Sequence, residues 1–194
     1  ARLDTLLRDV RARQNMVRSL LEDDPDAQEI DFIGTMGVNE DVSECVERLR
    51  RYLGVFDALE TTRPRNPEDL FRTLRQRVEH IGVFVLLIGD LGSPRYNPIS
   101  PSVFRGFAIA DRLAPFIVIN DRDAKPAWSF TLLHELTHLF VGTTGVSGAP
   151  TTLDPETSTA RIERFCNDVA SEFLLPASYI PPAPDFASKA EAAA

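Results

Sequence analysis

The pattern His-Glu-x-x-His at residues 134–138 constrains the fold of this 194-residue chain more than any other feature. Two histidines four positions apart lie on one face of an α-helix, where both imidazoles can meet one metal ion. The surrounding segment 126–141 is strongly apolar and is followed by Gly142, which is typical of a helix and its C-terminal end. The sequence therefore predicts a helix that carries a metal site, and it uses two of the three histidines of the chain.

The glutamate inside this pattern has a different predicted role. Glu135 follows the first predicted ligand, so its side chain can reach a water held by the metal. Zinc lowers the pKa of such a water to near 7, and a carboxylate can then take its proton. We predict that Glu135 is the catalytic base. Its side chain emerges about 100° around the helix from His134, and we expect it to face the open side of the metal rather than a sheet.

A catalytic zinc takes a third protein ligand and leaves a fourth position open. Two common continuations of the pattern are absent from this chain. One would need Gly and His where Val141 and Thr144 stand, and the other would need Asp where Val146 stands. The third ligand is therefore expected to be a carboxylate on a second helix. The candidates are Glu156, Glu163, Asp168 and Glu172.

Glu163 is the best placed of these four carboxylates. It shares a helical face with Asn167 and Leu174, and this face could turn toward the first helix. Asp168 and Glu172 lie about 100° or more off that face. Glu156 is better suited to the start of the helix.

Periodicity and capping signals predict the remaining elements. Helices are expected near 2–21, 40–53 and 67–81, with Asn39 and Asn66 as N-terminal caps of the second and third. Three short apolar runs predict buried strands near 83–88, 104–110 and 116–120. Helices near 126–141 and 156–175 should follow and face each other, with a loop between them from 142 to about 153. His80 is expected at a helix end on the surface.

Composition excludes several classes of protein. Hydrophobic residues make up 43% of the chain and charged residues 26%, which is ordinary globular usage. The net charge of −8 argues against direct nucleic-acid binding by this segment and against an anionic membrane surface. No run approaches the ~18 apolar residues of a membrane span, and the charged N-terminus differs from a secretory signal. Cys45 and Cys166 are expected to be reduced core thiols, so we expect a cytoplasmic protein.

The stretch HELTHLF, followed by IERFCNDVASEFLLP, resembles the ImmA/IrrE family of bacterial and phage metallopeptidases. The resemblance covers roughly 80–176 and is poor over the N-terminal helices. Cys166 and Val169 depart conservatively from the family's pattern. The matching residues of the second stretch include Glu163, Asn167, Ala170, Leu174 and Pro176.

The resemblance implies a metal site of His134, His138 and Glu163 with Glu135 as the catalytic residue. It implies zinc, although manganese or iron could take the same donors. It also implies an α+β, zincin-like fold in which a small three-stranded sheet packs on the metal-binding helix. We expect an N-terminal helical region at 1–65, the metallopeptidase domain at 66–180 and an extended tail at 181–194.

Members of this family are often fused to, or encoded beside, helix-turn-helix repressors, which they cleave under stress or on prophage induction. The resemblance therefore implies a zinc-dependent endopeptidase whose partner is such a repressor. Two alternatives stay open at this point. One is a non-catalytic metal-binding module that binds a partner, and the other is a metallohydrolase of small molecules. An intact Glu135 counts against the first, since binding alone needs no base.

Overall fold

The computed structural model describes residues 2–55, 64–91, 98–147 and 157–179. The predicted tail at 181–194 lies outside these described residues, and the predicted boundary between 65 and 66 stays a prediction. Along these ranges three helices come first and three strands follow, and two further α-helices with a short strand between them come next, which is the segregated order of an α+β protein. The helices in the described residues are α1 (Arg2–Glu22), α2 (Val42–Tyr52), α3 (Pro67–His80), α4 (Lys125–Val141), α5 (Ser158–Leu174) and the short 3-10 helix η1 (Ala177–Tyr179).

The sheet has the strand order β1-β3-β2-β4. Its strands are β1 (Phe84–Leu87), β2 (Gly106–Ile109), β3 (Phe116–Ile119) and β4 (Gly145–Ser147). Strand β1 runs parallel to β3, whereas β2 is antiparallel to both of its neighbours. The α+β class and the three predicted strands are confirmed. Strand β4 is a correction, because it lies in the segment predicted to be a loop.

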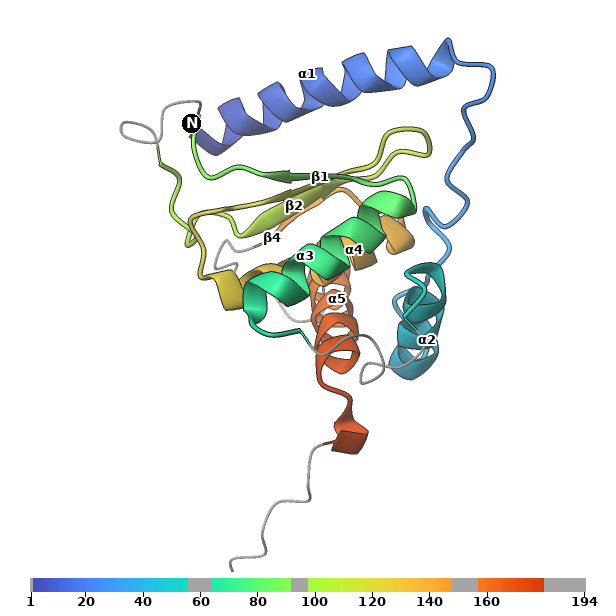
Figure 1. Cartoon of the computed structure of the whole chain (residues 1–194), viewed down its shortest axis with the longest axis vertical. Coiled ribbons are helices and arrows are strands. Elements are labelled where there is room, and N and C mark those ends of the chain that lie inside the picture. Colours follow the sequence, from blue (N-terminus) through green and yellow to red (C-terminus); the bar gives the residue numbers. More distant parts are fainter. Residues whose placement is uncertain (1, 56–63, 92–97, 148–156, 180–194) are drawn as a thin grey trace, which may run out of the picture.

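Helices cover both faces of the sheet (Figure 1). Helix α1 lies across one face, while α3 and α4 lie against the other, and α5 packs on the far side of α4. The strands alternate accordingly: Phe107 and Val118 belong to the core under α1, whereas Ala108 and Ile117 belong to the core around α4. Every residue of β2 and β3 is buried, which explains why these strands appear in the sequence as continuous apolar runs.

Two predicted helix starts need correction. Helix α2 is capped by Asp41, whose side chain accepts hydrogen bonds from the backbone amides of Ser43 and Glu44, and not by Asn39. Helix α5 is capped by Thr157 and begins at Ser158, two residues later than predicted. In both cases the oxygen-bearing side chain directly before the first helical residue is the one that reaches the free amides. The predicted first residue of α5, Glu156, lies outside the described residues. The predicted Asn66 cap of α3 is confirmed.

The described helices also bear on membrane insertion. None of them combines the length and the apolar character that crossing a bilayer requires. The most apolar of them, α4, is 17 residues long and is buried between the sheet and α5.

Candidate metal centre

Helix α4 brings its two histidines together in the protein interior. His134 and His138 are only 3% and 1% exposed, and their Nε2 atoms lie 3.1 Å apart. Both rings belong to the side of α4 that meets α5, the helix with which α4 makes its most extensive packing. The helical conformation that the sequence pattern required is therefore present, and both imidazoles point to one place.

Helix α5 supplies a carboxylate to the same place. One oxygen of Glu163 lies 3.3 Å from His134 Nε2, and the other lies 3.2 Å from His138 Nε2. Among the described residues, these three side chains form a group that could hold a metal ion. Of the other candidates, Asp168 is exposed, Glu172 accepts a hydrogen bond from the Ala177 amide, and Glu156 lies outside the described residues.

The spacing of these donor atoms fits a zinc ion. Donors at about 2.0–2.1 Å from a tetrahedral ion are separated from each other by about 3.3 Å. The three separations observed here, 3.1, 3.2 and 3.3 Å, agree with that value. Two imidazoles and one carboxylate are also a donor set typical of catalytic zinc. His134, His138 and Glu163 therefore fit the zinc ion that the sequence predicted.

The electrostatics of the site favour an ionised Glu163. Burial acts to raise its pKa, but hydrogen bonds and charges from His134 and His138 outweigh burial and lower the pKa to about 2. The carboxylate therefore remains negatively charged at neutral pH. This anion can balance part of the charge of a divalent ion at the site.

Glu135 is fully buried, and its orientation differs from our expectation. A Cβ atom placed on Gly106 of β2 would lie only 3.0 Å from Glu135 Oε1, so the carboxylate lies against the sheet. The expectation that Glu135 faces away from the sheet is therefore wrong. The reason is tertiary: α5 covers the histidine face of α4, and a turn of about 100° from it leads to the face that packs on β2.

Cys166 on α5 lies close to both carboxylates of the site. Burial raises the pKa of its thiol, and the charges of Glu135 and Glu163 raise it further. The side chain is completely buried. The thiol thus stays protonated and unreactive, as expected for a packed core cysteine.

Two residues near the site were missed from the sequence. Gly106 has no side chain at the point where Glu135 meets the sheet. Thr143 Oγ1 lies 3.0 Å from His138 Nδ1. A sequence signal existed for Thr143, because it follows Gly142, and the chain turns back over the last helical turn after such a glycine.

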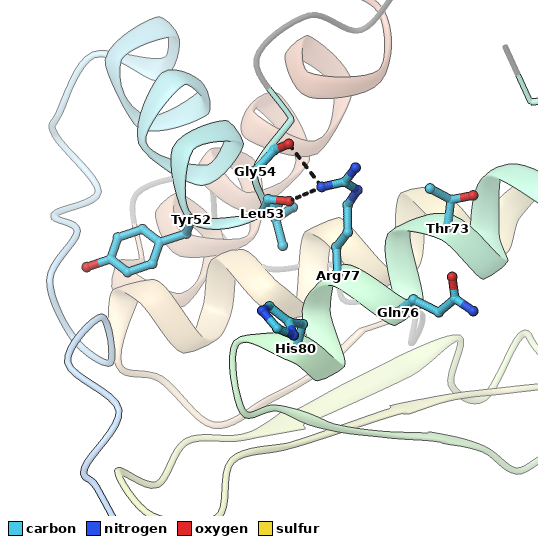
Figure 2. A pocket seen from close by; sticks show the side chains of 7 residues that line it. All are labelled: Tyr52, Leu53, Gly54, Thr73, Gln76, Arg77 and His80. Atoms are coloured by element: carbon cyan, nitrogen blue, oxygen red, sulfur yellow. Dashed lines mark hydrogen bonds between the residues drawn. The ribbon is translucent and has the colours of Figure 1, made fainter. Parts of the chain in front are cut away.

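A separate surface cavity of about 610 Å³ lies between the end of α2 and helix α3 (Figure 2). Arg77 crosses it and donates hydrogen bonds to the carbonyl oxygens of Leu53 and Gly54. His80 is exposed at its edge, as expected for a surface residue. The residues that line the cavity include no member of the His134–Glu163 group.

Comparison with known proteins adds one match. The family model of the IrrE N-terminal-like domain, peptidase family M78, matches residues 95–191, which is half of the chain. Neither the curated proteins nor the solved structures gave a match. The matched range includes β2, β3, both histidines on α4 and Glu163 on α5. The chain therefore belongs to the ImmA/IrrE family of metallopeptidases.

Proposed function

We propose that this protein is a zinc-dependent endopeptidase with Glu135 as its general base. The observation that carries the proposal is the convergence of His134, His138 and Glu163, whose donor atoms lie 3.1–3.3 Å apart. A divalent ion at this point supplies a Lewis acid that polarises a peptide carbonyl and makes water acidic near neutral pH. Manganese or iron could bind the same donors.

In this proposal Glu135 accepts a proton from the attacking water and later delivers it to the leaving amine. Two features support this role. The residue is covalently next to His134, and its carboxylate is completely buried, where low polarity strengthens its interactions with charged and polar groups. Its position beside Gly106 puts the carboxylate between α4 and β2. A water that gives its proton to Glu135 would therefore lie on the side of α4 that faces β2.

Strand β4 is the proposed site of substrate binding. Three residues separate it from the end of α4, and it pairs with β2 along one edge. In the part of the chain that the structure describes, β4 ends the sheet, so its outer edge can accept another strand. An extended peptide paired there would add a strand to the sheet. This arrangement would hold a peptide bond close to the helix that carries the histidines.

The proposed partner is a helix-turn-helix transcriptional repressor, cleaved in a stress or prophage response. This proposal rests on the family resemblance. The charge of the chain is consistent with it, because a net charge of −8 attracts the basic surface of a DNA-binding protein.

The experiment compares the wild-type protein with Glu135→Gln and Asp168→Asn. Each variant is incubated with a repressor encoded beside this gene, and cleavage is followed on a gel while bound zinc is measured. Glu135→Gln should lower the cleavage rate about 10²–10⁴-fold and leave the zinc content unchanged. Asp168→Asn removes a carboxylate from an exposed position of α5 and should cleave at the wild-type rate.

Equal cleavage by the Glu135→Gln and wild-type proteins would refute the mechanism. Zinc binding without cleavage of any tested repressor would favour the alternative of a non-catalytic regulatory module.

A further inference from the structure

We propose that Thr143 is a positioning residue of the metal site, which holds the His138 ring so that Nε2 presents its electron pair to the metal. The inference rests on the proposed metal-binding function and adds a residue outside the sequence motif. It concerns the orientation and protonation of one imidazole. The Thr143 hydroxyl lies against Nδ1 of His138, which is not one of the three atoms proposed to bind the metal.

When a metal ion replaces the proton that His138 Nε2 shares with Glu163, the hydrogen bonds around Thr143 accommodate the remaining ring proton on Nδ1. Its hydroxyl lies 3.0 Å from His138 Nδ1 and 3.4 Å from the His138 carbonyl oxygen. A hydroxyl has one proton, and a carbonyl can only accept. If the hydroxyl donates to the carbonyl, it can accept from Nδ1–H at the same time. In this arrangement Nδ1 carries the ring proton and Nε2 is free to bind a metal.

The backbone holds the hydroxyl in place independently of the imidazole. The amide of Thr143 donates to the His138 carbonyl at 2.9 Å, which closes the end of α4. Gly142 makes this turn possible because its φ angle is +79°, in the left-handed region. On the other side, the Thr144 hydroxyl accepts a hydrogen bond from the Ala110 amide. Loss of the Thr143 hydroxyl alone would therefore leave the turn intact.

The two histidines differ in this respect. His134 Nδ1 is buried and has no hydrogen-bond partner among the described residues. Of the two imidazoles, His138 is thus the one whose distal nitrogen is held by a protein side chain there. Partners of this kind orient the ring and raise its basicity, and their loss typically weakens metal binding about 10–100-fold.

The test measures zinc affinity by competition with a chromophoric chelator. The test variants are Thr143→Val, which keeps the shape but not the hydroxyl, and Thr143→Ala, which covers the case that valine prevents folding. Thr143→Ser keeps the hydroxyl and removes only the methyl group. Thr144→Val removes the neighbouring hydroxyl and serves as a control. We expect about 10–100-fold weaker binding for the first two variants and wild-type affinity for the last two.

A second readout separates positioning from a purely structural role. In the zinc-loaded protein, the His138 Nδ1–H proton should give a sharp NMR signal in wild type and Thr143→Ser. In Thr143→Val it should exchange rapidly with water. Unchanged zinc affinity and an unchanged proton signal in Thr143→Val would overturn this inference alone. Failure of wild type to bind zinc would overturn the proposed function as well, whereas full cleavage by Glu135→Gln would leave this inference standing.

Discussion

Replacing Gly106 by alanine tests whether Glu135 packs against the sheet. Gly106 lies in β2, between β3 and β4, where the backbone is held from both sides. An added Cβ would lie 2.6 Å from the Thr131 methyl carbon and 3.0 Å from both Glu135 Oε1 and the Val118 carbonyl oxygen. Such distances are shorter than van der Waals contact, so the strand, Thr131 or Glu135 must move.

The expected loss of stability follows from two opposing terms. Overpacking a buried site costs about 1–3 kcal/mol. Replacing glycine by alanine also lowers the conformational entropy of the unfolded chain, which stabilises the folded state by about 0.4–1 kcal/mol. The midpoints of the two terms give a net destabilisation of about 1.3 kcal/mol, within limits of about 0–2.6 kcal/mol. For a chain of this length, about 1.3 kcal/mol corresponds to a fall in melting temperature of about 3–5 °C.

Calorimetry and a double-mutant cycle provide the assay. Thr131→Ser removes the methyl group that collides with the new Cβ, at a cost of about 0.8 kcal/mol for the lost burial. If the collision is real, Gly106→Ala should destabilise the Thr131→Ser protein less than it destabilises wild type. Gly37→Ala is the matched control. There a Cβ would meet only the Glu40 side chain, at an ordinary distance of 3.5 Å.

The same substitution should also affect the chemistry. If alanine displaces the Glu135 carboxylate, cleavage should slow while zinc stays bound, because no ligand is removed. A Gly106→Ala protein with wild-type stability and wild-type cleavage would show that Glu135 does not occupy the space above Gly106. Strictly additive effects in the cycle would show that Thr131 does not occupy it.

Two further predictions concern the charged groups. Glu163→Gln removes the anionic donor, so we expect zinc affinity to fall by more than 100-fold and the rise in melting temperature on zinc addition to disappear; a zinc-dependent rise equal to wild type would contradict the site. Glu40 has a lowered pKa because it accepts a hydrogen bond from the Gly37 amide, with a further contribution from Arg48. Its contribution to stability is therefore present above the ordinary glutamate pKa of about 4.3 and is lost as pH falls through its lower folded value. The melting temperature of Glu40→Gln should thus lie below wild type at pH 7 and approach it in acid, and a constant difference across this range would refute the assignment.

The sequence predicted the long elements well because their signals are local. The apolar periodicity of α4, the Asn66 cap of α3 and the apolar runs of β2 and β3 all lie within the elements that they specify. Strand β4 lacks such a signal, since it is three residues long and contains glycine and serine. Its extended conformation comes from pairing with β2, nearly forty residues earlier in the chain.

The site shows the same division between local and tertiary information. The spacing of His134 and His138 required a common helical face, and the structure has it. The placement of Glu163 followed from its face on α5 and from the family resemblance. The direction of Glu135 could not follow from helix geometry alone. It depends on which side of α4 the sheet covers, and this is decided by packing.

The N-terminal part of the chain completes the end of the metal-binding helix. The last carbonyl groups of a helix lack partners within the helix. Here the Gly34 amide donates to the Leu139 carbonyl at 3.2 Å, and the Met36 amide donates to the Phe140 carbonyl at 2.9 Å. Phe32 stacks on Phe140 with ring centroids 4.3 Å apart. Phe32, Gly34 and Met36 precede the range 95–191 that the family model matches. The C-terminal end of α4, which leads into the turn with Thr143, is therefore stabilised by residues outside the family match.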